Sequence, residues 1–202
     1  MKTKFKVANK WLLLMAVPFI SIILVVIFRH EYYPTNEEIL EFIKNTKAYS
    51  SQVDYTIKNS RGEYNEETNI YYGKELGMRI EFGQERVKIY KDGYISMNDN
   101  GEEYKIDEDL DKVYTLSFVS NLLSNEIKEV KEGSEEWGDT KYLEIEISLP
   151  FKNNHMSLAK LYINKKDKCP IVTKIYDINH NEKMTIVYKN FKYLNEINKE
   201  MF

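Results

Sequence analysis

Histidine, cysteine and clustered carboxylates are the side chains most able to catalyse a reaction or bind a metal. The three histidines of this chain are His30, His155 and His180. No two of them have the H-x-x-x-H or H-E-x-x-H spacing that directs two imidazoles at one zinc ion. His155 and His180 fall in predicted turns, and His30 flanks an apolar stretch. We therefore interpret none of them as a ligand or a catalytic base.

Cys169 is the only cysteine in the chain. A single cysteine excludes an intramolecular disulfide and every metal site built from several cysteines. It precedes Pro170, and no histidine stands at a spacing typical of a cysteine nucleophile. We interpret Cys169 as an incidental thiol.

Two acidic stretches, Asp177–Asn181 and Asp107–Asp111, superficially resemble calcium-binding loops. Such a loop needs Gly at its sixth position and Glu at its twelfth. The first stretch has Glu182 and Tyr188 there, and the second fails at the same two positions. We predict a hairpin turn and a helix start instead.

Nucleotide-binding and hydrolase motifs are also missing from the sequence. There is no G-x-S-x-G, no phosphate loop and no G-x-G-x-x-G. Carboxylates are so frequent that a glycosidase-like pair can be neither singled out nor excluded. The sequence therefore predicts a protein that is not an enzyme, with no catalytic, cofactor-binding or metal-binding residues; a weak hydrolase is the alternative left open.

Aromatic residues could form a different kind of site, a contact surface for another protein. Tyrosine combines a large apolar ring with a polar hydroxyl, which suits an interface on the outer face of a sheet. Ordinary strand composition is the alternative explanation. The candidates are Tyr71, Tyr72, Phe82, Tyr90, Tyr94, Tyr104, Tyr142, Tyr162 and Tyr176.

The charge distribution excludes two classes of partner. All 32 acidic residues follow His30, whereas five of the 29 basic residues precede it. The remainder of the chain therefore has a net charge of −8, although the whole chain has −3. Nucleic acid requires clustered Lys and Arg, so nucleic-acid binding is excluded. Anionic lipid headgroups should also repel so acidic a domain.

The N-terminal segment has the composition of a membrane anchor. Trp11 to Phe28 contains no charge, and about 18 residues at roughly 1.5 Å each just span a bilayer core. Four lysines precede the stretch and only Arg29 follows it before the first glutamates, which places the N-terminus in the cytoplasm. We predict a cytoplasmic segment at 1–10, a transmembrane signal anchor at 11–29 and an extracytoplasmic domain at 31–202.

A cleaved signal peptide is the alternative to an anchor. Cleavage requires small residues after the apolar core, but residues 26–29 read Val-Ile-Phe-Arg. A lipoprotein is excluded because no cysteine stands near the end of the apolar run. The sequence thus favours an uncleaved anchor.

Hydrophobic periodicity predicts the elements of the domain. Thr35 and Glu38 form a capping box at the start of a helix that should run to about Tyr49. A second helix is expected from Leu110 to Ile127, and residues 129–140 read as a loop or edge hairpin. Alternating apolar positions predict strands near 53–57, 78–82, 87–89, 95–97, 104–106, 143–149, 158–163, 171–176, 184–188 and 191–194.

These elements indicate a mainly β fold with helices (α+β), of roughly 170 residues in one domain. About nine to eleven antiparallel strands should curl around the helices into a half-open β-barrel. Its concave face would be lined by Met78, Ile80, Phe82, Val87 and Ile89. We interpret these residues as core; an acyl-chain site is the alternative.

The order of elements, together with several C-terminal segments, resembles a known family. The segments are Leu149-Pro150, KCPIVTKIYD at 168–177, NEKMTIVYKNF at 181–191, Asn-Glu-Ile at 195–197 and the final Phe202. They resemble the LolA/LolB-like lipoprotein-carrier superfamily, and within it the clostridial germination lipoproteins of the GerS type. The resemblance covers roughly residues 35–202.

That resemblance implies a role in spore formation and germination. GerS-type proteins bind and activate the cortex N-acetylmuramoyl-L-alanine amidase CwlD, and zinc and catalysis belong to that partner. The resemblance implies a CwlD-like cell-wall amidase as partner and no cofactor in this chain. The family's lipid-bearing cysteine is missing here, so the apolar span would replace it as anchor. A lipid or lipoprotein carrier or sensor at the cell envelope, holding an acyl chain, is the alternative function.

Overall fold

The computed structural model describes residues 16–26, 33–133, 140–151 and 155–202. The chain divides into two compact units, Met1–Pro34 and Thr35–Phe202. In the first unit residues 16–26 are α-helical, and their apolar side chains are exposed, with Phe19 at 70%. Across the described ranges no helix is both long and apolar enough to cross a membrane. Both ends of the predicted span, 11–15 and 27–29, and His30 lie outside the described residues, so the anchor stays a prediction.

The second unit begins with helix α2 (Asn36–Lys44), and its predicted capping box is confirmed. The Thr35 hydroxyl accepts a hydrogen bond from the Glu38 N–H (3.2 Å), and the Glu38 carboxylate accepts one from the Thr35 N–H (2.9 Å). The predicted end near Tyr49 was wrong, because the helix ends at Lys44. Tyr49 pairs instead with Tyr72 and Tyr193 on two neighbouring strands, and these ladder bonds outweigh one further helical turn.

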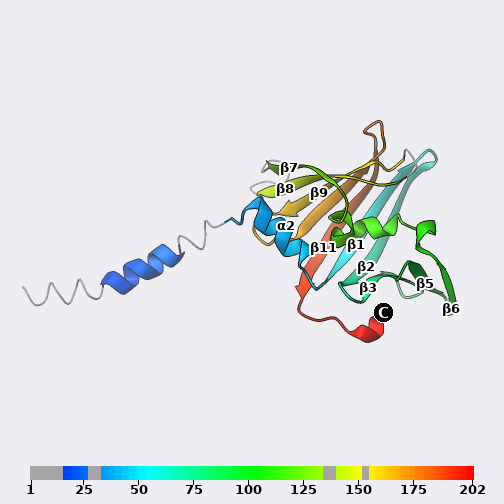
Figure 1. Ribbon diagram of the computed structural model, residues 1–202, viewed down its shortest axis with the longest axis horizontal. Coiled ribbons are helices and arrows are strands. Elements are labelled where there is room, and N and C mark those ends of the chain that lie inside the picture. The colour runs from blue at the N-terminus through cyan, green and yellow to red at the C-terminus, as the bar shows by residue number, and fades with distance from the viewer. Residues whose placement is uncertain (1–15, 27–32, 134–139, 152–154) are drawn as a thin grey trace, which may run out of the picture. The chain divides into compact units, whose positions relative to one another are not determined.

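All strands belong to one antiparallel sheet of eleven, in the order β6-β5-β4-β3-β2-β1-β11-β10-β9-β8-β7. Figure 1 shows this sheet as an open, curved layer, with α2 and the segment after β6 lying against one face. The strands are β1 (Ala48–Asn59), β2 (Gly62–Gly73), β3 (Gly77–Phe82), β4 (Arg86–Lys91), β5 (Tyr94–Asp99), β6 (Glu102–Asp107), β7 (Ile127–Gly133), β8 (Tyr142–Ser148), β9 (Leu158–Asn164), β10 (Pro170–Tyr176) and β11 (Glu182–Leu194).

The sheet does not close into a barrel. In the described part of the chain, β6 and β7 each pair with one strand only and form the two edges. Eleven antiparallel strands confirm the predicted mainly β class and lie at the upper end of the expected number. Residues 184–188 and 191–194 belong to one strand, β11, which contains a register shift near Asn190 (φ 52°).

The hydrophobic core lies on the face that α2 and the segment after β6 cover. It includes Ile39 from α2, Val53 from β1, Ile80 from β3 and Leu161 from β9, all fully buried. Burial of each such side chain contributes about 1.5–3 kcal/mol relative to exposure. We call this side of the sheet the inner face, and the opposite side the outer face.

The predicted helix from Leu110 to Ile127 was wrong. The chain forms η1 (Glu108–Leu110), η2 (Tyr114–Ser117) and α3 (Val119–Leu122), and Ile127 already begins β7. Phe118 is extended (φ −88°, ψ 110°) and fully buried, so it separates η2 from α3. The hydroxyls of Thr115 and Ser117 donate to carbonyls three residues back, which competes with a regular helix. The apolar side was nevertheless predicted correctly, since Leu116, Val119, Leu122 and Leu123 are buried.

Asp177 organises the turn between β10 and β11, as predicted for this stretch. Its carboxylate accepts hydrogen bonds from the N–H groups of Asn179 (2.9 Å) and Asn181 (2.8 Å) and from the Asn181 side chain (3.0 Å). The Lys183 ammonium lies 3.1 Å away. These hydrogen bonds, those of Asn181 first, hold the pKa of Asp177 far below its usual range.

We expect Asp177→Asn to lower the melting temperature at pH 7, because an amide NH₂ would face N–H donors. A lowered folded-state pKa stabilises the protein above the unfolded pKa of about 3.9, and this contribution is lost as pH falls below it. The difference in melting temperature between wild type and variant should therefore shrink as pH falls below about 4. Asp92→Asn, the same change in an exposed turn, is the control. A difference that does not change with pH would contradict this assignment.

Candidate functional site

The predicted lining of the concave face was partly wrong. Ile80 on β3 is paired with Lys88 on β4, and Met78 with Tyr90, so Lys88 and Tyr90 take the inner positions of β4. Because side chains alternate along a strand, Val87 and Ile89 point to the outer face. Met78, Ile80 and Phe82 do face inward, and Ile80 and Phe82 are buried in the core, at 0 and 8% exposure. An acyl chain at this position would have to displace the segment that covers them.

The inner face contains a polar network that joins the segment after β6 to the sheet. Lys88 forms an ion pair with Asp111, and its ammonium lies 4.6 Å from the centre of the Tyr114 ring. Arg86 forms an ion pair with Glu66 of β2, and the Tyr114 hydroxyl donates to the same carboxylate (2.5 Å). The Lys88–Asp111 pair and the Tyr114–Glu66 hydrogen bond join the segment after β6 to the sheet and hold η2 against it, whereas the Arg86–Glu66 pair joins β4 to β2.

This network has the properties of a structural feature rather than of a catalytic centre. Burial, supported by Glu66, raises the pKa of the Tyr114 hydroxyl, so it stays protonated at neutral pH. Burial raises the pKa of Tyr90 in the same way, and its hydroxyl has no hydrogen-bond partner in the described part of the chain. Lys88, which is buried, and Arg86, which is partly exposed, each face one carboxylate.

Cys169 lies just before β10, and the histidines that the structure describes are His155 and His180. Cys169 is half-buried, and burial, with Asp167 nearby, raises the pKa of its thiol to about 12. A thiol with that pKa is almost entirely protonated at neutral pH and is a poor nucleophile. His155 and His180 are exposed in turns. Within the described ranges no three His, Cys, Asp or Glu residues are grouped to hold a metal ion.

The aromatic candidates are divided between the two faces. The register places Tyr72, Phe82 and Tyr90 on the inner face. Tyr142 and Tyr162 pack against each other on the outer face but are only 8 and 4% exposed, so they offer little contact area. The outer tyrosines, which also include Tyr71, Tyr94 and Tyr176, are spread from β2 to β10. A continuous tyrosine surface stays a prediction.

The outer face of β3 to β6 has a groove of about 770 Å³. Val87 and Ile89, the aliphatic side chains that β4 turns outward, lie in it, with Arg79 of β3 and Lys105 of β6 also lining it. Gln84, Ser96, Asn98 and Glu103 also line it. Met97 and Tyr104 contribute atoms to the groove as well, although the pairing of β5 with β6 directs both side chains, including the candidate Tyr104, to the inner face. We call this hollow the outer groove.

The chain's C-terminal segment lies beside the outer groove. The Arg79 guanidinium donates to the carbonyl of Met201 (2.6 Å) in η3 (Lys199–Met201), and also binds Glu81 (2.8 Å). Arg79 is thereby fixed between β3 and the C-terminal segment. An aliphatic floor with fixed charges at its rim can bind a polypeptide.

The sequence matches a family model described as sporulation protein YdcC-like over residues 9–202. The chain belongs to this family of YdcC-like sporulation proteins. The match includes the apolar N-terminal stretch as well as the whole sheet. It confirms the predicted connection with sporulation, whereas the finer assignment to GerS-type germination proteins stays a prediction. No curated protein matches the sequence.

Solved structures resemble this YdcC-like protein in fold. An uncharacterized conserved protein from Thermus thermophilus has a TM-score of 0.53 at 11% identity, over 82% of this chain and 91% of that chain. A chain in the complex of the CwlD amidase with the GerS lipoprotein from Clostridioides difficile has a TM-score of 0.47 at 19% identity, over 81 and 99%. The LolA superfamily protein NE2245 from Nitrosomonas europaea has a TM-score of 0.47 at 10% identity, over 84 and 97%.

The outer groove was missed at the sequence level. Residues 86–90 read Arg-Val-Lys-Ile-Tyr, so aliphatic side chains alternate with charged or aromatic ones. This pattern allows either the aliphatic pair or the other three side chains to face inward. The apolar set was assigned to the core because aliphatic residues are usually buried. Only the pairing of Ile80 with Lys88 shows that the charged set faces inward.

Proposed function

We propose that this YdcC-like protein is a non-catalytic partner of a cell-wall amidase in sporulation. It would bind a cortex N-acetylmuramoyl-L-alanine amidase of the CwlD type and raise its activity. The observation that carries the proposal is the match to the sporulation family across residues 9–202. The amidase is suggested by the GerS-like segments, KCPIVTKIYD at 168–177 and NEKMTIVYKNF at 181–191.

The chemistry of the domain supports a partner protein over an enzyme. The buried charges are neutralised in pairs, and the Cys169 thiol is protonated at neutral pH. The outer groove instead offers aliphatic and charged groups to a protein surface. Catalysis would therefore reside in the amidase, and this chain would supply binding energy and orientation.

Location at the membrane is part of the proposal. The uncharged stretch from Trp11 to Phe28 would anchor the protein, and the four preceding lysines would stay in the cytoplasm. The domain from residue 31 onward would then lie outside the cytoplasm, where peptidoglycan and its amidases are found.

The alternative function, a carrier that holds an acyl chain, is less well supported, because the inner face of the sheet is already covered. The covering segment is the part of the chain from η1 to α3, which lies against the inner face. Its residues Phe118 and Leu122 are fully buried against the sheet, together with Ile80. Side chains of the protein itself therefore occupy the surface on which an acyl chain would lie. A bound lipid would require this segment and its Lys88–Asp111 ion pair to move.

The proposal predicts that the full chain activates a CwlD-type amidase from one side of the membrane. Purified amidase and cortex peptidoglycan would be added to right-side-out membrane vesicles that contain the full chain. We expect amidase activity to increase there and to remain at the basal level with inside-out vesicles or vesicles without the chain. Product release is measured by chromatography of the digested peptidoglycan.

Each other outcome would reject a particular part of the proposal. Activation by inside-out vesicles only would reverse the orientation, and activation by neither would reject the partner function. Lipid extraction and mass spectrometry of the same purified chain provide the test of the alternative. Stoichiometric lipid in a chain that leaves the amidase unchanged would favour the carrier.

A further inference from the structure

We propose that the free edge of the sheet at β6 binds an extended, basic segment of the partner protein by strand addition. The inference deepens the proposed partner function by naming a docking surface and the chemistry of what docks there. In this mode the peptide becomes the next strand, and main-chain hydrogen bonds provide most of its affinity.

The backbone of β6 has unused hydrogen-bonding groups directed away from the sheet. A two-residue turn, Asn100-Gly101, joins β5 and β6, so Asp99 and Glu102 form a hydrogen-bonded pair. Hydrogen-bonded and non-hydrogen-bonded pairs then alternate along the hairpin. The bond from the Glu108 N–H to the Gly93 carbonyl (3.1 Å) fits this alternation at the far end.

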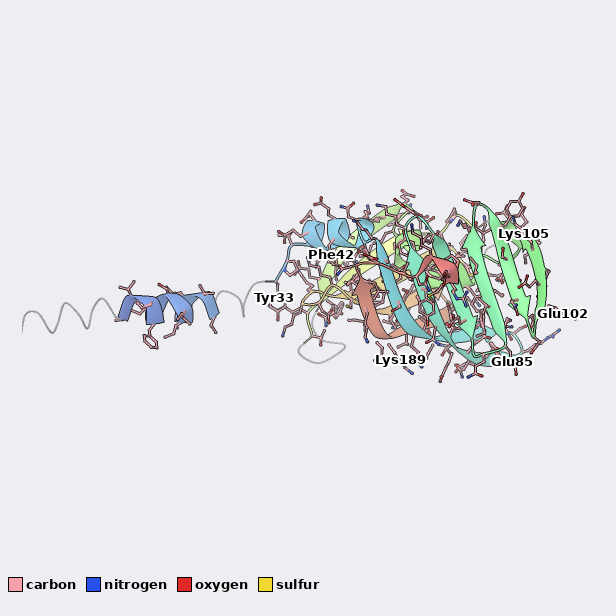
Figure 2. All side chains as sticks on the ribbon, turned by 90° about the horizontal axis from the view of Figure 1, so that it is seen from below. Tyr33, Phe42, Glu85, Glu102, Lys105 and Lys189 are labelled. Carbon is pink, nitrogen blue, oxygen red and sulfur yellow. The ribbon has the colours of Figure 1, made fainter. Side chains whose placement is uncertain are left out.

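The groups that face outward are therefore the N–H and C=O groups of Glu103 and Lys105 and the N–H of Asp107, whose C=O is at the N-cap of η1. All three residues are exposed, and β6 has only β5 as a neighbour within the described residues. Figure 2 shows Glu102 and Lys105 at the margin of the sheet. The pairing of β6 with β5 has no register shift, so the edge is regular enough to receive a further strand.

The opposite edge lacks these properties. β7 contains a register shift between Ile127 and Glu129, a local bulge that discourages further pairing. Its two lysines and two glutamates balance one another, and Glu132 is bound to Lys165 (2.7 Å). The two edges therefore differ in both regularity and charge.

The negative charge around β6 indicates what kind of peptide segment would bind there. Residues 92–111, which form β5, β6 and the turns around them, contain eight Asp or Glu residues and one basic residue, Lys105. This net charge of −7 is most of the −8 that the chain carries after His30. Asp111 and Asp109 are paired with Lys88 and Lys112, and the other acidic residues keep the hairpin negative. A second copy would be repelled, whereas an extended segment rich in Lys or Arg would be attracted.

The outer groove gives the added strand a place for its side chains. Glu103 and Lys105 of β6 line the groove, so it reaches the free edge. Alternate side chains of a strand next to β6 would lie on the outer face beside Glu103 and Lys105, at the end of the groove farthest from Val87 and Ile89 of β4. Long side chains that end in a cation, such as Lys or Arg, would place the cation beside Glu103 and match the acidic edge.

The test uses the full chain in detergent and a short synthetic peptide in which Lys alternates with Val and Thr. One control peptide has Glu in place of Lys, and a second has N-methyl groups at alternate backbone positions, which prevents strand pairing. We expect binding of the Lys peptide only, weaker at high salt, with slower amide exchange at Glu103, Lys105 and Asp107. Equal binding of the N-methylated peptide would overturn the proposal.

A pair of variants isolates the backbone contribution. Lys105→Pro removes an outward N–H and is tolerated at an edge strand, whereas Lys105→Ala removes the same charge and keeps the N–H. We expect Lys105→Pro to weaken peptide binding about tenfold, the effect of roughly 1.4 kcal/mol, and Lys105→Ala to bind at least as tightly as wild type. Equal affinities of the two variants would reject strand addition.

The amidase assay separates this inference from the proposed function. If Lys105→Pro still activates the amidase fully, β6 is not the docking edge, although the partner function stands. If the wild-type chain binds the peptide but leaves the amidase unchanged, the edge has another partner and the amidase proposal fails.

Discussion

Replacing Lys88 with alanine is expected to lower the free energy of unfolding by about 3–5 kcal/mol, the usual effect of removing one member of a buried ion pair. The Lys88 side chain is 8% exposed and its partner Asp111 is 20% exposed, so the carboxylate that remains is poorly hydrated. The variant also loses the contact between the ammonium and the Tyr114 ring. Chemical denaturation monitored by circular dichroism measures the change.

A variant that removes both charges provides the control for Lys88. Lys88→Met combined with Asp111→Asn removes both charges and keeps the volume, so it should recover most of the lost stability. Amide exchange in η2 and α3 should increase in Lys88→Ala and return toward wild type in the double variant. If Lys88→Ala unfolds within about 0.5 kcal/mol of wild type, as a surface substitution does, the network does not hold the covering segment.

Gly77→Ala should lower the free energy of unfolding by about 3 kcal/mol or more, since backbone strain and a steric clash add together. Gly77 begins β3 with φ +113°, a conformation that residues with a side chain rarely adopt. An added Cβ would also lie well within 3.0 Å of the carbonyl oxygen of Tyr90, which belongs to the backbone of β4 and cannot rotate away. The first pairs between β3 and β4 must then separate, and thermal or chemical unfolding would show the effect.

Gly83→Ala is the matched control for Gly77→Ala. Gly83 also has a positive φ (+64°), but no atom lies within 4 Å of its added Cβ. Its replacement should cost only the backbone strain, about 1–2 kcal/mol. Equal losses at the two positions would mean that the contact with Tyr90 has no energetic role.

Local signals in the sequence predicted the elements well where they do not depend on distant partners. The capping box of Thr35 and Glu38 involves residues three apart, and it forms as expected. Alternation of apolar residues likewise predicted most strands and the hairpin turn at Asp177. β2 was not predicted, because its first half carries exposed polar residues on both faces.

Errors arose where a distant partner decides the conformation. β4 alternates aliphatic with charged or aromatic side chains, and pairing with β3 determines which set faces inward. The length of α2 and the break at Phe118 depend in the same way on contacts with the sheet. The free edge at β6 could not be predicted from residues 102–107, because strand order is a property of the whole sheet.

The pairing of β1 with β11 has a consequence for how the domain forms. The Ser51 hydroxyl donates to the carbonyl of Lys189 (2.9 Å), and the ladder between these strands joins the halves of the sheet. Such distant contacts require a large loop to close before they contribute stability, so folding is slow relative to a chain with local contacts. β1 pairs with β2 in the first hairpin, but it has no second neighbour until β11 has been synthesised. In the topology proposed above, in which the chain from residue 31 onward crosses the membrane, the domain would therefore complete its fold only after translocation of β11.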